Sequence, residues 1–305
     1  MDFKTITIIG FGLIGSSLAR KIKQESLCET LVCGDISQSV CDTVLDMKLA
    51  DAAYTDLGEA VKDADLVIIC VPVGIYGAVG ERISGSLKAG AIVTDVGSVK
   101  AQVIEALSAY IPADVTFVPS HPIAGTEKSG PEHGFSSLFT DRWFIVTPID
   151  GGRNAEAVTK VCALWEACGS MVETMTPEHH DKVLGITSHL PHLIAFSIVG
   201  TANDLEDDIK SEVIKYSAGG FRDFTRIAAG DPTMWRDIFL HNKDAVLDVL
   251  QRFNEDLTEL QKAIRRDEGD KLFDFFRKTS TIRKGVVDAR QDTPPTPTPS
   301  DEASR

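Results

Sequence analysis

The sequence lacks the features that mark several classes of protein. No continuous apolar run approaches the roughly 20 residues that a membrane span needs, so we expect no membrane contact. There is no room for a signal peptide, because MDFKTITIIG leads directly into a predicted strand. The net charge of −14 argues against a nucleic-acid partner, since the phosphate backbone attracts basic surfaces. The composition is that of an ordinary soluble globular protein.

Cysteine is present, but its spacing is not that of a zinc site or a disulfide framework. The six cysteines contain no C-x-x-C pair, and most of them stand in apolar runs. We therefore expect reduced, buried thiols, no metal, and a cytoplasmic location.

The most informative segment is TITIIGFGLIGSSLA, residues 5–19. A short β-branched run leads into Gly10, Gly12 and Gly15, which have G-x-G-x-x-G spacing, and Leu13 and Ile14 open a helix. This order of strand, glycine turn and helix is typical of dinucleotide binding, because the turn lets the backbone and the helix N-terminus approach a pyrophosphate.

Asp35 indicates which dinucleotide is bound. It ends a second apolar run, 20 residues after Gly15, where a carboxylate accepts hydrogen bonds from the ribose hydroxyls and repels a 2′-phosphate. The residues at 36–39 supply no Arg or Lys for that phosphate, so we predict NAD rather than NADP. We also assign Val71 and Pro72, at the end of another apolar run, to cofactor binding.

The alternation of elements predicts an α/β fold. Strand candidates lie at 5–9, 30–34, 66–71, 91–95 and 115–118, with helices between them, notably at 16–24 and 99–109. This pattern is typical of a doubly wound parallel sheet of the Rossmann type. We assign further strand signals at 143–147 and 171–174, which flank a helix near 154–168, to the same sheet.

After residue 175 the sequence is predicted to be helical. Thr176-Pro177-Glu178 and Asp231-Pro232 are helix starts, with a capping residue before proline. Apolar residues between 245 and 264 recur at alternating spacings of four and three, so this helix packs lengthwise on another, within the chain or in a dimer, and we favour a homodimer. We therefore divide the chain into a dinucleotide-binding domain (1–175), an all-helical substrate and dimerisation domain (176–290) and a disordered Pro/Thr-rich tail (291–305).

Two polar segments follow strands of the predicted sheet. SHPIAGTEKSGPEHG (120–134) comes after the strand at 115–118 and contains His121, Thr126 and Glu127, at the sheet edge where doubly wound folds bind ligands. Ser98 lies in TDVGSVK (94–100). His121 is a candidate base or a structural loop histidine, and Ser98 a substrate contact or a helix cap.

Two more clusters lie in the helical part. His189 and His192 stand three apart in ITSHLPHLIAF, and could contact substrate, make internal hydrogen bonds or, less readily, bind metal. Arg222 and Arg226 stand four apart after a Gly-Gly break; such forks suit a carboxylate, but could equally pair with neighbouring aspartates.

Taken together, GFGLIGSS, DVGSVK, HPIAGTEKSG, TSHLPH and GGFRDFTRIAAGDPTMWRDIF resemble the prephenate dehydrogenase family of tyrosine biosynthesis, which includes arogenate and cyclohexadienyl dehydrogenases. The resemblance extends from residue 5 to about 285. It implies NAD-dependent oxidative decarboxylation of prephenate, arogenate or both. No residue indicates which of the two substrates is preferred.

The resemblance also implies roles for single residues. His121 would bind the ring hydroxyl and promote hydride transfer, assisted by Ser98. Arg226 would hold the substrate carboxylate, and His189 would orient the substrate. The remaining substrate-binding candidates are His192 and Thr126, together with Glu127, Arg222 and Trp235, which match a polar group at the pocket entrance.

Two alternatives remain. A β-hydroxyacid- or imine-type oxidoreductase shares the domain plan, but would place a catalytic lysine at the start of the helical part, where this chain has histidines. A non-catalytic NAD sensor would bind the cofactor without turnover.

Overall fold

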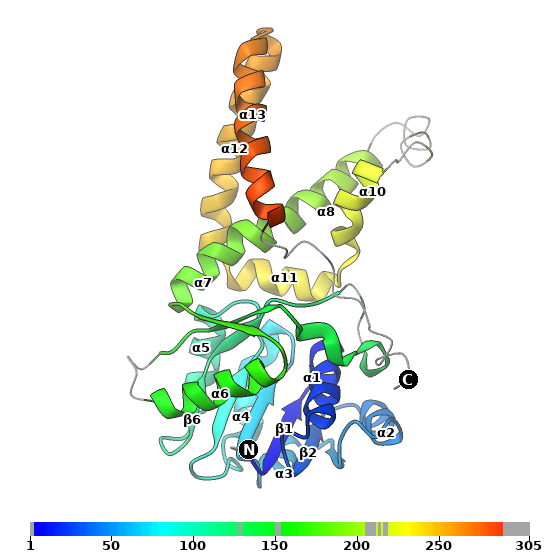
Figure 1. Ribbon diagram of the computed structural model, residues 1–305, viewed down its shortest axis with the longest axis vertical. Helices are drawn as coiled ribbons and strands as arrows, with labels where there is room; N and C mark the ends of the chain where they lie inside the picture. Colours follow the sequence, from blue (N-terminus) through cyan, green and yellow to red (C-terminus); the bar gives the residue numbers. More distant parts are fainter. Residues whose placement is uncertain are drawn as a thin grey trace.

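The computed structural model describes residues 3–126, 128, 130–149, 154–204, 212, 215 and 219–288. It consists of a nucleotide-binding fold with a helical assembly above it (Figure 1). Six parallel strands form the main sheet in the order β3-β2-β1-β4-β5-β6, which confirms the predicted doubly wound α/β class. The strands are β1 (Thr5–Ile9), β2 (Thr30–Gly34), β3 (Ala52–Tyr54), β4 (Leu66–Ile69), β5 (Ile92–Asp95) and β6 (Thr116–Val118).

Helices cover both faces of this sheet because successive strand residues point to opposite sides. Ile8 and Ile68 belong to the apolar cluster under α1 (Leu13–Gln24), α2 (Gln38–Asp46) and α6 (Ala155–Ala167). Ile9 and Ile69 belong to the cluster under α3 (Leu57–Val61), α4 (Tyr76–Ile83) and α5 (Ala101–Ser108). Buried on both faces, these strands are continuous apolar runs, which is why the sequence revealed them.

One strand assignment is wrong. The segments at 143–147 and 171–174 do form strands, β8 (Trp143–Val146) and β9 (Met171–Thr174), but they pair with β7 (Ser120–Pro122) in a separate three-stranded sheet. Pro119 ends β6, since it has no N–H to donate to a ladder, and its carbonyl accepts from the Thr147 amide at 2.9 Å. The chain therefore leaves the main sheet one residue before β7.

The helical part begins as predicted. Thr176 caps α7 (Pro177–Leu184) by accepting from the His179 amide at 3.2 Å, and Asp231 caps α11 (Pro232–His241) by accepting from the Met234 amide at 2.8 Å. The other elements are η4 (Gly185–His189), α8 (Leu190–Asn203), α10 (Gly219–Thr225), η5 (Arg226–Ala229), α12 (Lys243–Arg265) and α13 (Gly269–Asp288). Short 3-10 turns are η1 (Val73–Ile75), η2 (Pro131–His133) and η3 (Ser136–Phe139).

A single π-helical turn, η4, joins α7 to α8. The Leu190 amide bonds to the Gly185 carbonyl five residues back, and Pro191, which has no N–H, follows in the first turn of α8. By length and composition, the continuous helix Pro177–Asn203 could cross a membrane, which the sequence analysis did not anticipate. In this structure it packs against α10, η5 and α12 of the helical part.

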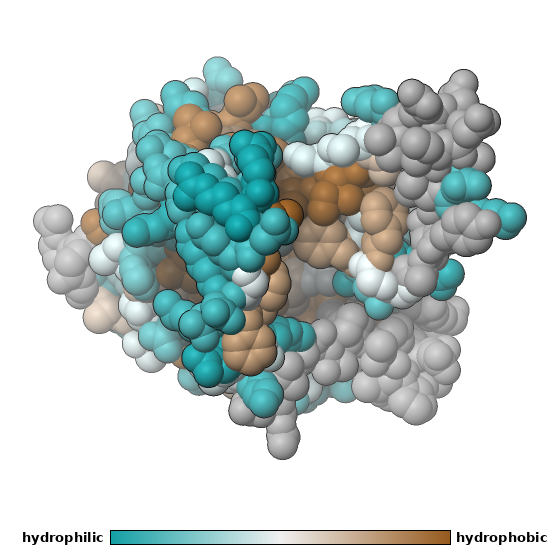
Figure 2. Space-filling model, turned by 90° about the horizontal axis from the view of Figure 1, so that it is seen from above, coloured by the Kyte–Doolittle hydropathy of each residue, from teal (hydrophilic) through white to brown (hydrophobic). Residues whose placement is uncertain are grey.

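The predicted helical seam lies on α12, which forms a projecting arm with α13 (Figure 1). Val246, at its start, is buried, whereas Leu257 and Ile264 are exposed, so packing within the chain accounts for part of the seam. Viewed down the arm, apolar side chains gather beside it on the α8 side (Figure 2). Exposed large apolar residues on these elements are Ile198, Val199, Leu247, Leu257, Ile264, Phe273, Phe275, Phe276 and Ile282.

Candidate active site

The glycine turn is shaped to receive a phosphate group. Gly10 has φ of +89°, and a Cβ there would lie 2.6 Å from the Cys70 carbonyl oxygen; a Cβ on Gly15 would lie 2.1 Å from the Gly10 carbonyl oxygen. Gly12 differs, because a Cβ there would meet nothing within 4 Å. It is also the N-cap of α1, with no side-chain cap on the helix amides. The open side of the turn therefore presents a helix N-terminus, which suits a pyrophosphate.

Asp35 lies beside this turn. Its Oδ2 accepts from the Phe11 amide at 3.1 Å, and its Oδ1 accepts from the Ser37 amide at 3.0 Å. A Cβ on Gly10 would lie 3.0 Å from Val71 Cγ1, so the end of β4 adjoins the same turn, with Pro72 next in the chain. The predicted dinucleotide residues thus meet at one sheet edge.

Leu13 and Ile14 take a different part. Leu13 is buried and Ile14 packs against the same apolar cluster, in the first turn of α1. Their side chains pack α1 against the sheet, so only their backbone amides are available to bind a phosphate.

His121 lies on β7, opposite Ile145 of β8. Its Nδ1 is 2.8 Å from Nε2 of His180 on α7, and the two rings meet edge to face. The pKa of His121 is well below its usual value, chiefly because of burial and also because the ammonium group of Lys100 opposes a positive charge there. The imidazole is therefore neutral near pH 7.

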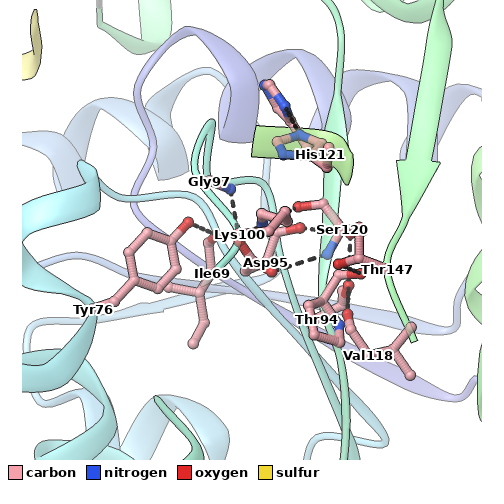
Figure 3. A network of polar contacts seen from close by, with 12 residues as sticks. Ile69, Tyr76, Thr94, Asp95, Gly97, Lys100, Val118, Ser120, His121 and Thr147 are labelled. Atoms are coloured by element: carbon pink, nitrogen blue, oxygen red, sulfur yellow. Dashed lines mark hydrogen bonds and ion pairs between the residues drawn. The ribbon is translucent and has the colours of Figure 1, made fainter. Parts of the chain in front are cut away.

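A fully buried ion pair supports β7 from below (Figure 3). The ammonium group of Lys100 donates to Asp95 Oδ2 at the end of β5 and, at 2.5 Å, to the carbonyl of Ser120. Asp95 also accepts from the Ser120 amide at 3.0 Å and from the Gly97 amide at 2.8 Å. Burial lowers the pKa of Lys100, while Asp95 opposes that shift. The pair ties the end of β5 to the residue before His121.

Ser98 lies half-buried in the same loop, between β5 and α5. It does not cap that helix, because the N-cap is Lys100, whose side chain makes no capping bond. The helix-cap interpretation of Ser98 is therefore excluded.

His189 is buried in the π turn. Asn242 Nδ2 donates to the Asp181 carbonyl at 2.8 Å and lies 3.0 Å from His189 Nδ1, so Nδ1 is the acceptor and Nε2 carries the hydrogen. Within the described residues, this buried Nε2 has no partner. Burial lowers the pKa of His189 to about 4. A buried N–H donor without a partner is costly, and a substrate acceptor would satisfy it.

His192 and Trp235 pack against each other. Nδ1 of His192 donates to the Ser188 carbonyl at 2.8 Å, and its ring stacks on Trp235 with centroids 3.7 Å apart. Trp235 is buried and also meets the His189 ring edge to face. Burial first, and then the charge of Arg226, lowers the pKa of His192.

The two arginines lie on α10 and η5, the elements that pack against α8. Arg226 starts η5, which packs against α8, and is exposed; Arg222 is exposed on α10. Thr126, half-buried after β7, accepts from the Lys128 amide at 3.2 Å. Glu127 lies outside the described residues. Among the described residues, no group of three or more His, Cys, Asp and Glu side chains is arranged to hold a metal.

Sequence reasoning missed five polar residues of this site: Lys100, Asp95, His180, Asp181 and Asn242. A signal existed for two of them, because Asp95 and Lys100 are charges at the end of an apolar strand in TDVGSVK, where an unpaired charge would be costly. His180 and Asp181 stand in the first turns of a helix that was predicted, but their partners come from distant segments.

Comparison with known proteins gives a consistent result. The chain matches the models of two parts of one family: "prephenate dehydrogenase, nucleotide-binding domain" over residues 18–174, and "prephenate dehydrogenase, dimerization domain" over residues 176–278. It is 43% identical to the cyclohexadienyl dehydrogenase of Zymomonas mobilis over 281 residues, which cover 92% of this chain and 95% of that protein.

Solved structures agree. The prephenate dehydrogenase of A. aeolicus, determined with hydroxyphenyl propionate and NAD+, superposes with a TM-score of 0.87 at 33% identity, covering 94% of this chain and 99% of that one. Synechocystis arogenate dehydrogenase superposes with a TM-score of 0.78 at 27% identity, covering 92% and 99%. The chain therefore belongs to the prephenate dehydrogenase family.

Proposed function

We propose that this cyclohexadienyl dehydrogenase of tyrosine biosynthesis uses His121 as the base that accepts the ring hydroxyl proton. The observation that carries this proposal is the position of His121: its Nδ1 lies 2.8 Å from Nε2 of His180, and it lies beyond the carboxyl end of the main sheet, where burial keeps its pKa low and favours the neutral ring. A neutral imidazole with one free nitrogen can accept a proton.

The glycine turn and Asp35 support NAD as the cofactor. The open backbone at Gly12 fits a pyrophosphate, and the carboxylate of Asp35 suits ribose hydroxyls. Held by the glycine turn and Asp35, NAD+ would supply the hydride acceptor for oxidation of the carbinol carbon of the ring. The A. aeolicus relative, which was solved with NAD+, has the same fold.

The other groups hold the substrate. Arg226 is proposed to bind the substrate carboxylate. The unpartnered Nε2–H of His189 is proposed to donate to a second acceptor on the substrate. Ser98 assists at the ring hydroxyl. The substrate-binding set is completed by five further residues: His192, Trp235, Thr126, Glu127 and Arg222.

Proton transfer to His121 accompanies the loss of the ring carboxylate as CO2. Aromatisation of the ring makes the reaction strongly favourable. The relatives include a prephenate dehydrogenase and an arogenate dehydrogenase, so we propose activity on prephenate, arogenate or both. Steady-state rates with both substrates and both cofactors test this; no turnover of either substrate with NAD+ would refute it.

We also propose a homodimer formed through the helical part. The match to a dimerisation domain and the exposed apolar side chains of α8, α12 and α13 support it. Light scattering coupled to size exclusion measures the mass in solution. We retain the division at 1–175 and 176–290, which the limits of the two family matches support, and a cytoplasmic location; the segment 291–305 lies outside the described residues.

A further inference from the structure

The bond from His121 to His180 continues to a third residue. Nδ1 of His180 lies 2.8 Å from Oδ1 of Asp181, so three side chains form one line from the proposed base into the helical part. His180 is fully buried and Asp181 is nearly so. Neither residue has a role in the reaction as described above.

The far end of this line is fixed by the backbone. Asp181 Oδ1 accepts from the Lys100 amide at 2.8 Å, and Oδ2 accepts from the Ala101 amide at 2.9 Å, at the start of α5. Burial raises the pKa of Asp181, but the bond from His180 and these two amides outweigh it, and the pKa lies below its usual value. Asp181 is therefore a carboxylate, which only accepts hydrogen bonds.

This fixes every hydrogen along the line. Because Asp181 only accepts, Nδ1 of His180 must carry its hydrogen. His180 is neutral, since burial lowers its pKa more than Asp181 raises it, so its Nε2 holds a lone pair. That lone pair faces Nδ1 of His121, which must therefore carry a hydrogen. Nε2 of His121 is left with its lone pair.

We propose that His180 and Asp181 are positioning residues that hold His121 in its Nδ1–H tautomer and so make Nε2 the atom that accepts the proton. This inference rests on the proposed role of His121 as the base. It identifies the nitrogen of His121 that accepts the proton and the residues that select this nitrogen.

The hydrogen-bond line from His121 to Asp181 also stabilises the positive charge that forms on His121 during proton transfer. The substrate O–H bond breaks and an Nε2–H bond forms on His121, which makes an imidazolium near Lys100. Its Nδ1–H then donates to a histidine that is itself bonded to a carboxylate. The negative charge of Asp181, two hydrogen bonds away, offsets the repulsion from Lys100 without any further proton transfer.

The tautomer can be read without substrate. In protein labelled with 15N-histidine, two-bond 1H–15N spectra show which ring nitrogen of each histidine carries hydrogen. We expect His121 and His180 both to be protonated at Nδ1 near pH 7, with assignments from single His→Gln variants. A His121 protonated at Nε2 would overturn the proposal, even if catalysis depends on His180.

The His180→Phe variant tests the consequence. A phenyl ring has no hydrogen-bond donor or acceptor and bridges neither neighbour, so the Nε2–H form of His121 should appear, and kcat should fall about 10-fold to 10²-fold with little change in KM. The matched control is His179→Phe, at the adjacent, exposed histidine on the same helix, which should keep both constants. Melting temperatures and KM for NAD+ show whether the variants are folded.

Each result has one meaning. A kcat of His180→Phe within twofold of the unmutated enzyme, or an equal loss in both variants, overturns the positioning role. If the unmutated enzyme turns over neither prephenate nor arogenate, the proposed function fails, while the tautomer spectra still decide the hydrogen-bond line.

Discussion

Replacing Lys100 with methionine should destabilise the protein more than any surface charge change. The side chains of Lys100 and Asp95 are both fully buried, so the variant leaves a carboxylate in the interior without its counter-charge. Breaking a buried pair in this way costs about 3–5 kcal/mol. Asp95 keeps its bonds from the Gly97 and Ser120 amides, which favours the lower end, about 3 kcal/mol.

Calorimetry or thermal unfolding followed by circular dichroism measures this loss. For a domain of this size, each kcal/mol shifts Tm by about 2–4 °C, so Lys100→Met should lower Tm by about 6–12 °C. The control is Lys62→Met, because the ion pair of Lys62 with Glu59 is solvent-exposed. The Tm of this variant should hardly differ from that of the unmutated protein.

A double variant tests the cause. When Asp95→Asn is combined with Lys100→Met, no uncompensated charge remains, so the double variant should lose less stability than the two single losses added. A Tm of Lys100→Met within 2 °C of the control, or losses that simply add, would refute the view that the pair acts as a unit.

Five further outcomes are expected. His121→Asn should lower kcat by about 10²-fold with little change in KM, and a near-normal kcat would make His121 structural. In the unmutated enzyme, kcat/KM should hold through mildly acidic pH and fall only below the lowered pKa of His121, because the neutral form is the base. His189 has a folded pKa of about 4 against about 6.5 unfolded, so stability should be complete above pH 6.5 and decline towards pH 4, as Tm against pH will show; a His189→Gln variant should decline less. Arg226→Ala should raise KM strongly and Arg226→Lys should recover only part of it, whereas a large fall in Tm with unchanged KM would point to a structural role. Asp35→Ser should relax the preference for NAD+ over NADP+, and a preference for NADP+ in the unmutated enzyme would contradict the role of Asp35.

The sequence predicted the elements whose signals are local. The strands at 5–9 and 30–34 match the structure because buried parallel strands are short apolar runs, and the helix starts at Thr176 and Asp231 match because a cap and a proline mark them. β3 was missed, because it spans only Ala52–Tyr54 and three residues show no clear period.

The site divides in the same way. The glycine turn and Asp35 are recognisable in sequence, since one spacing fixes the geometry of a whole turn. The partners of His121 are not, because His180 approaches it from 59 residues away and Asp181 reaches amides about 80 residues before it in the chain. The sequence also did not show that β8 and β9 join a separate sheet. That arrangement follows from Pro119, after which the chain leaves the main sheet.

The π turn between α7 and α8 sets the phase of the helix that contains it. An α-helix advances by about 100° per residue, so the residue that widens this turn rotates everything before it relative to everything after it. His180 and Asp181 lie before the turn and His192 after it, and the two groups face different parts of the site. Deleting Ile186, which is exposed and in the turn, would restore an ordinary helix and turn one group away by that angle, while leaving the composition of the site unchanged.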